Sequence, residues 1–118
     1  MKELGMGISI KCHCDTYADE VIWLVKSLNH PDIGACIDTI NSLCVLEGIQ
    51  ESVEKMLPYA NCCHLCDNEL RTDHNGTHSI GMPVGTGDVD CATIVRQFRE
   101  CSPTVSYTHR TLPAKRRV

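Results

Sequence analysis

The sequence of 118 residues predicts an α/β fold built from about three consecutive strand–helix units with parallel strands. Three short apolar segments give this prediction, because each is followed by apolar residues at helical spacing. Strand–helix–strand series join parallel strands by right-handed crossovers. The pattern fits an open doubly wound sheet as well as part of a barrel.

The first unit begins with a strand over residues 7–13, in which Ile8 and Ile10 alternate with smaller or polar residues. This strand leads to Lys11 and His13 at its carboxyl end. The following helix reaches Asn29 and carries a stripe at 3.6-residue spacing, formed by Val21, Leu24, Val25 and Leu28.

The second unit starts in the apolar stretch 33–46, whose strand ends at Asp38. A buried strand has little reason to finish on a carboxylate unless that end is wet, capped or liganded, and ligands of α/β folds bind at such ends. Capping of the next turn is the competing explanation for Asp38. A helix then carries Ile49, Val53, Met56 and Leu57 and ends at Pro58.

The third unit has a short strand from about Asn61 to Leu65, with His64 near its end. Residues 66–89 are polar and rich in glycine, which predicts a long functional loop. Asp90 is placed to cap a last helix with an apolar face of Cys91, Ile94, Val95 and Phe98.

Chemically active side chains follow all three strands. The ends of adjacent parallel strands converge on one rim, so we expect these groups to meet there: Lys11, His13, Asp38, Asn41, His64 and Asp67. A carboxylate and an imidazole are ligands for a divalent cation, which makes Asp38 and His64 candidate metal ligands. Structural hydrogen bonding is the alternative role for this pair.

The nine cysteines are odd in number and scattered, and no export signal precedes them. They are therefore expected to be reduced thiols in a cytoplasmic protein. A zinc–thiolate module built on Cys12, Cys14, Cys63 and Cys66 is the alternative.

Charge and hydropathy exclude several partners. Residues 1–104 carry seven basic and fifteen acidic side chains, which argues against binding of nucleic acid. Continuous apolar runs stop at about 8 residues, far short of a membrane-spanning helix. No glycine-rich phosphate fingerprint opens a helix, so a dinucleotide fold has no support.

Four segments in this order resemble the xylose-isomerase-like TIM-barrel superfamily of sugar phosphate isomerases and epimerases, which also includes endonuclease IV. The segments span residues 8–15, 33–43, 64–67 and 83–90. The resemblance implies a partial TIM (β/α)8 barrel over residues 1–104, since eight units need about 250 residues.

The resemblance also implies chemistry. In that family a rim site holds one divalent ion, such as Mn, Mg, Co or Zn, and two glutamates move a proton beside the carbonyl of a sugar or polyol. By position Asp38 and His64 match the metal ligands, and His13, Asn41 and Asp67 match substrate contacts. Lys11 stands at the position of the first glutamate, so this chain has an incomplete ligand set and impaired acid–base chemistry.

An endonuclease-IV-like zinc phosphodiesterase remains the second enzymatic hypothesis. Residues 105–118 form a separate basic tail that resembles the in-frame translation of a transposase sequencing adapter, or else a disordered segment that binds an acidic surface. A three-unit piece of a barrel also exposes apolar edges, from which self-association is expected.

Overall fold

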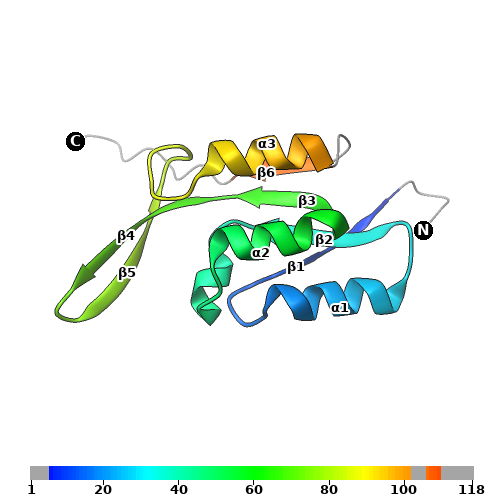
Figure 1. Cartoon of the computed structure of the whole chain (residues 1–118), viewed down its shortest axis with the longest axis horizontal. Coiled ribbons are helices and arrows are strands. Elements are labelled where there is room, and N and C mark those ends of the chain that lie inside the picture. Colours follow the sequence, from blue (N-terminus) through cyan, green and yellow to red (C-terminus); the bar gives the residue numbers. More distant parts are fainter. Residues whose placement is uncertain (1–5, 102–105, 110–118) are drawn as a thin grey trace.

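The computed structural model describes residues 6–101 and 106–109. Four parallel strands form one sheet (Figure 1) in the order β1 (Ile8–Lys11), β2 (Ile33–Asp38), β3 (Ala60–Leu65) and β6 (Ser106–His109). The connections contain the helices α1 (Ala18–Leu28), α2 (Ile49–Met56) and α3 (Cys91–Cys101), with short 3-10 turns η1 (Asn41–Val45) and η2 (Leu57–Tyr59). The prediction of three consecutive βα units is confirmed.

Strand register decides which side chains meet. Lys11 pairs with Cys36, and Asp38 pairs with His64, across neighbouring parallel strands. Side chains alternate between the two faces of a strand, so Lys11, Asp38 and His64 share one face. The opposite face presents Ala35, Ile37 and Cys63 to the helices, where all three are fully buried.

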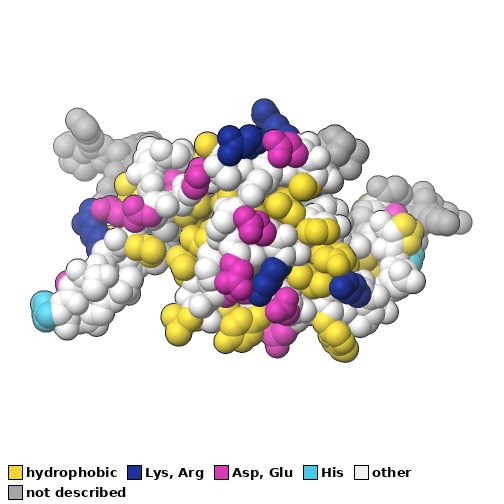
Figure 2. Space-filling model, viewed as in Figure 1, with side chains coloured by type: hydrophobic (Ala, Val, Ile, Leu, Met, Phe, Trp, Pro, Cys, Tyr) yellow, Lys and Arg dark blue, Asp and Glu magenta, His cyan; other side chains and the backbone are white. Residues whose placement is uncertain are grey.

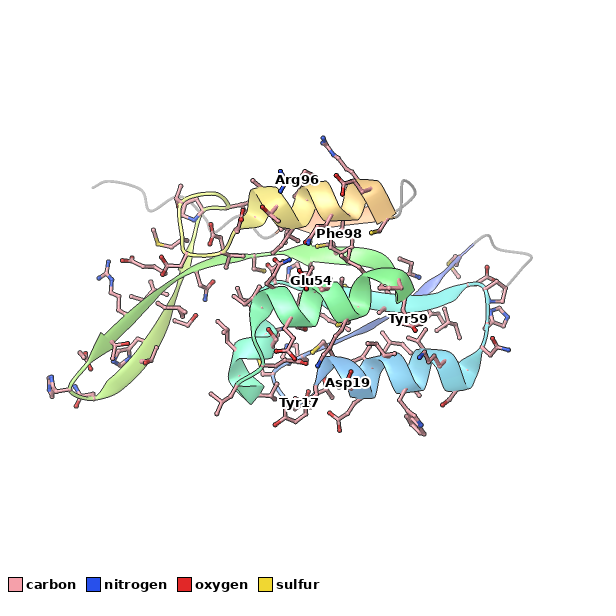
Figure 3. All side chains as sticks on the ribbon, in the orientation of Figure 1. Tyr17, Asp19, Glu54, Tyr59, Arg96 and Phe98 are labelled. Carbon is pink, nitrogen blue, oxygen red and sulfur yellow. The ribbon has the colours of Figure 1, made fainter. Side chains whose placement is uncertain are left out.

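The helices cover that opposite face and build the core with it (Figure 1). Phe98 points from α3 toward the sheet (Figure 3) and is fully buried, as are Val53 and Met56 of α2. Truncating a buried phenylalanine to alanine typically costs about 3–5 kcal/mol. Hydrophobic side chains also remain visible on the outer side of this layer (Figure 2), where Trp23, Leu24 and Leu28 of α1 are exposed.

Acidic side chains fix the starts of α1 and α3. Glu47 accepts a hydrogen bond from the N–H of Ala18 at 2.9 Å, so the segment after η1 caps α1. Asp90 accepts from the N–H of Thr93 at 3.0 Å, as the sequence predicts for the start of α3.

The prediction of a long loop over residues 66–89 is wrong for its first part. These residues contain an antiparallel hairpin of β4 (Asp67–Asp73) and β5 (Gly76–Met82) that projects from the sheet (Figure 1). The hairpin turns at His74-Asn75, and the next residue, Gly76, has a φ of 128°, a conformation that favours glycine. Polar strands with one exposed face hide the apolar alternation on which strand prediction depends.

The expected boundary near residue 104 stays a prediction. Ser106–His109 lies within the segment set apart as a tail, and its backbone pairs with β3 as the strand β6. The other residues of that segment, and residues 1–5, lie outside the described part of the chain.

Of the helices within the described residues, none combines the length and the apolar character that a bilayer crossing requires.

Candidate functional site

A cleft of about 230 Å³ lies where the carboxyl ends of β1, β2 and β3 meet the base of the hairpin. The six side chains singled out from the sequence all line it: Lys11, His13, Asp38, Asn41, His64 and Asp67. The convergence expected from parallel strand ends is therefore observed. The wall is completed by Cys66, predicted only for the zinc–thiolate alternative, and by residues without a predicted role, namely Ile40, Asn68, Gly81 and Met82.

Asp38 divides its two carboxylate oxygens between the backbone and the cleft. Oδ1 accepts hydrogen bonds from the N–H groups of Ile40 and Asn41 at 3.0 and 3.1 Å, so Asp38 does cap the following turn. Oδ2 faces Lys11 and His64. Burial raises the pKa of Asp38, but the Ile40 N–H and the contacts with Lys11 and His64 outweigh it and bring the pKa below its usual value. The buried carboxylate is therefore charged.

Lys11, Asp38 and His64 form a three-way contact. Nδ1 of His64 lies 2.7 Å from Oδ2 of Asp38 and 2.8 Å from Nζ of Lys11, and Nζ lies 3.0 Å from the same Oδ2. Nδ1 carries either one proton or a lone pair, so it donates to Asp38 or accepts from Lys11 but cannot do both. The protonation of Nδ1 therefore decides whether His64 donates a hydrogen bond to Asp38 or accepts one from Lys11.

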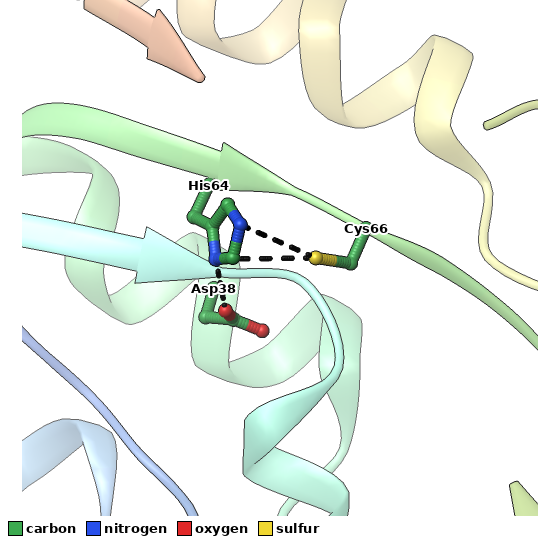
Figure 4. Close-up of side chains that lie close together, drawn as sticks. All are labelled: Asp38, His64 and Cys66. Atoms are coloured by element: carbon green, nitrogen blue, oxygen red, sulfur yellow. Dashed lines mark hydrogen bonds and ion pairs between the residues drawn. The ribbon is translucent and has the colours of Figure 1, made fainter. Parts of the chain in front are cut away.

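Cys66 adds a sulfur donor to this cluster. Its Sγ lies 3.7 Å from Nε2 and 3.9 Å from Nδ1 of His64 (Figure 4). Within the described residues, Asp38, His64 and Cys66 are the group of three side chains close enough to hold a metal ion, with ligand atoms within 4.8 Å of one another. Cys66 was missed as a partner of this pair, because the sequence links it to Cys63 instead.

The donor set does not fit a divalent cation while Lys11 keeps its position. A metal ion would take Oδ2 of Asp38 and Nδ1 of His64, the two atoms that Nζ of Lys11 already contacts at 3.0 and 2.8 Å. A lysine ammonium has no lone pair for a metal and repels a second positive charge. The carboxylate and imidazole expected for a metal site are present together, but the ammonium of Lys11 contacts both of them.

Asn41 and His13 occupy the other side of the cleft. The side chain of Asn41 donates from Nδ2 to the carbonyl oxygen of Cys12 at 3.3 Å and accepts from the thiol of Cys14 at 3.5 Å. These bonds hold its amide against the β1–α1 loop. His13 is exposed on that loop. Both are positioned for a ligand, and their expected substrate contact stays a prediction.

Asp67 is committed to the backbone of the next loop. Its carboxylate accepts hydrogen bonds from the N–H groups of Gly85, Gly87 and Val89 at 2.8, 2.9 and 3.1 Å. Burial raises the pKa of Asp67, but these N–H groups lower it by more, so the pKa lies below its usual value. The geometry favours Asp67 as the organiser of the loop after β5, and its expected substrate contact stays a prediction.

The structure does not bring the four cysteines of the zinc–thiolate hypothesis together. Cys12 and Cys63 lie in the hydrophobic core, whereas Cys14 is exposed and Cys66 lines the cleft. Burial raises the pKa of Cys63 to about 12, which disfavours the thiolate that zinc binds. In the described ranges, no three of these thiols form a metal-binding group.

Two solved structures are similar in fold to this chain. No family model and no curated protein matches the sequence. A xylose isomerase-like TIM barrel protein from Mycobacterium smegmatis, whose crystal structure is a complex with magnesium, has a TM-score of 0.80 and 21% identity over 97% of this chain and 40% of that one. A xylose isomerase domain protein from Planctomyces limnophilus has a TM-score of 0.72 and 19% identity over 95% of this chain and 41% of that one.

The chain thus spans about two fifths of the length of both solved structures. The likeness at this level of identity concerns the fold, and it confirms the partial α/β barrel with parallel strands. It also resolves the choice between an open sheet and a barrel that the strand–helix pattern leaves open. The chain has the fold of part of a xylose isomerase-like TIM barrel.

Proposed function

We propose that this chain is part of a sugar or polyol isomerase or epimerase, and that its cleft binds a small polyhydroxylated carbonyl compound. The contact of Lys11, Asp38 and His64 carries the proposal, because it gathers charged and proton-exchanging groups at the carboxyl ends of barrel strands. Active sites of TIM barrels lie at these ends. A cleft of about 230 Å³ has the volume of roughly seven water molecules, which suits a small ligand.

Isomerisation and epimerisation beside a carbonyl require a group that exchanges a proton with carbon and a group that stabilises the developing oxyanion. His64 is suited to the first task, since its imidazole lines the cleft and contacts both a carboxylate and an ammonium. Lys11 is suited to the second, since its side chain lines the cleft and is one-third exposed. No glutamate is among the described residues that line the cleft, which supports impaired proton transfer in this chain.

The donor chemistry also bears on the choice of metal in this proposal. An ion that entered after Lys11 had moved aside would meet oxygen, nitrogen and sulfur from Asp38, His64 and Cys66. Mixed donors of this kind suit Zn²⁺ or Co²⁺, whereas Mg²⁺ prefers six oxygen ligands. A multi-zinc phosphodiesterase is less well supported, because the described residues supply one such group.

Ligand-observed NMR with D-fructose and with xylitol tests the proposal. We expect saturation transfer from the chain to the sugar, and loss of that transfer in the Asp38→Ala/His64→Ala double variant. Arg99→Glu is the control, because Arg99 is exposed on α3 and does not line the cleft. Equal transfer in the double variant and the control would contradict a sugar site in this cleft.

A second readout addresses proton transfer itself. In D₂O, exchange at C1 of D-fructose removes its proton signal without requiring turnover. We expect slow exchange that depends on His64. Rapid conversion of the sugar by the natural chain would contradict the impairment.

A further inference from the structure

We infer that the Lys11 side chain takes the place of the divalent cation in this cleft, so that the site binds its ligand without a metal ion. The replacement concerns the cleft of the proposed function but does not depend on which carbonyl compound binds there. Lys11 then neutralises the charge of Asp38 and contacts the ligand, instead of lying beside a metal ion.

The first step is the position of the ammonium. Nζ of Lys11 lies within 3.0 Å of both Oδ2 of Asp38 and Nδ1 of His64. Both atoms are donors that a metal ion held by Asp38, His64 and Cys66 could use. The Lys11 ammonium already contacts both atoms. The three atoms contact one another, because Nδ1 and Oδ2 themselves lie 2.7 Å apart.

The second step is the origin of that position in the fold. Lys11 is the last residue of β1 and shares a sheet face with Asp38 and His64, which follow on the next two strands. A side chain as long as lysine reaches across the strand between them, because neighbouring strands lie about 4.8 Å apart. The register of the sheet therefore directs the ammonium to the cluster.

The third step is charge. The carboxylate of Asp38 is 2% exposed, so it needs a cation close by. Lys11 supplies one, and the pair is neutral as a whole. A divalent ion added to this pair would bring two further positive charges next to the ammonium.

The fourth step is accessibility to a ligand. The Lys11 side chain is 33% exposed, whereas that of Asp38 is almost fully covered. Lys11 lines the cleft, and its ammonium carries three N–H groups, more than its contacts with Asp38 and His64 occupy. A carbonyl or carboxylate oxygen of a ligand is the group that these donors recognise.

Titration with Mn²⁺ alone tests this inference, with the electron paramagnetic resonance signal of free Mn²⁺ as the readout. The natural chain is compared with Lys11→Glu, which supplies a carboxylate, and with Lys11→Met, which removes the charge at similar length. Arg99→Glu is the matched control, since it changes net charge by the same amount on an exposed part of α3. Circular dichroism confirms that each variant is folded.

We expect no saturable Mn²⁺ binding by the natural chain or the control, and saturable binding by Lys11→Glu. This binding should disappear when Asp38→Asn is added. Lys11→Met decides the question if Lys11→Glu does not fold, because it too removes the ammonium from the donors. Saturable binding by the natural chain that Asp38→Asn abolishes would overturn the inference, and so would absence of binding in both Lys11 variants. Sugar binding is read separately by NMR, so failure of the proposed function would not be mistaken for failure here.

Discussion

Replacing Asp67 by asparagine tests how the cleft wall is held. The carboxylate of Asp67 accepts from three backbone N–H groups of the loop after β5, through Oδ2 for Gly85 and Gly87 and through Oδ1 for Val89. Asparagine keeps one oxygen and turns its NH₂ group toward at least one of these donors. A hydrogen bond to a charged group contributes about 1.5–3 kcal/mol, so we expect the free energy of unfolding to fall by about 2 kcal/mol.

Urea unfolding followed by circular dichroism at pH 7 measures this loss. About 2 kcal/mol is a large part of the roughly 5–15 kcal/mol that stabilises a typical domain. Asp15→Asn is the control, because Asp15 is exposed and surface changes of this kind stay within about 0.5 kcal/mol. A loss in Asp67→Asn no larger than that of the control would refute the role given to Asp67.

The pH dependence offers a second check on the same residue. The pKa of Asp67 in the folded chain is below its usual value, so its contribution to stability is complete above the unfolded pKa of about 3.9 and is lost as the pH falls through the folded pKa. The difference between the natural chain and Asp67→Asn should therefore shrink below about pH 4. A difference that stayed constant down to pH 3 would show that the charge of Asp67 is not responsible.

Two further predictions concern thiols and edges. Exposed Cys14 and Cys44 should react with a maleimide in the folded chain, whereas Cys63, whose pKa burial raises to about 12, should react only on unfolding. Peptide mass spectrometry after a short labelling pulse measures the extent of reaction at each cysteine. Equal labelling of the three cysteines would contradict the burial of Cys63 in the core. Trp23→Glu should reduce self-association in sedimentation experiments, because Trp23 lines an apolar groove of about 490 Å³ beside the unpaired edge of β1. Leu46→Glu, at an exposed site outside that groove, should not, and a monomeric natural chain would contradict the prediction.

Several features of the fold follow from the sequence because local pattern and tertiary packing agree. The apolar run of β2 has one period, and Ile37 is buried as that period predicts. The predicted stripe on α1 is only half buried, because Val21 and Val25 are in the core whereas Leu24 and Leu28 are exposed. The meeting of Asp38 and His64 also follows, since parallel strand ends converge wherever the units are consecutive.

Other features depend on contacts that no local pattern contains. Residues 67–82 are mostly polar and lack a regular apolar alternation, so their pairing shows only in the Asn75-Gly76 sequence signal and in β-forming residues such as Thr72 and Thr77. The contact of Lys11 with His64 depends on strand register and on the reach of a flexible side chain. The resemblance indicates only that Lys11 stands where the resembled family has a glutamate. It does not indicate where the Lys11 ammonium lies.

The hairpin of β4 and β5 is a site at which the chain could accept inserted residues. Its base is held by Asp67 and Asn68, which are buried, while its tip at residues 73–76 is exposed and makes short-range hydrogen bonds. Loop tips of this kind accept inserted sequence because no core residue has to move. Only the base of the hairpin lines the cleft, so a binding loop or a whole small domain could be grafted at residues 74–75 without altering the cleft wall or the strands that carry Asp38 and His64.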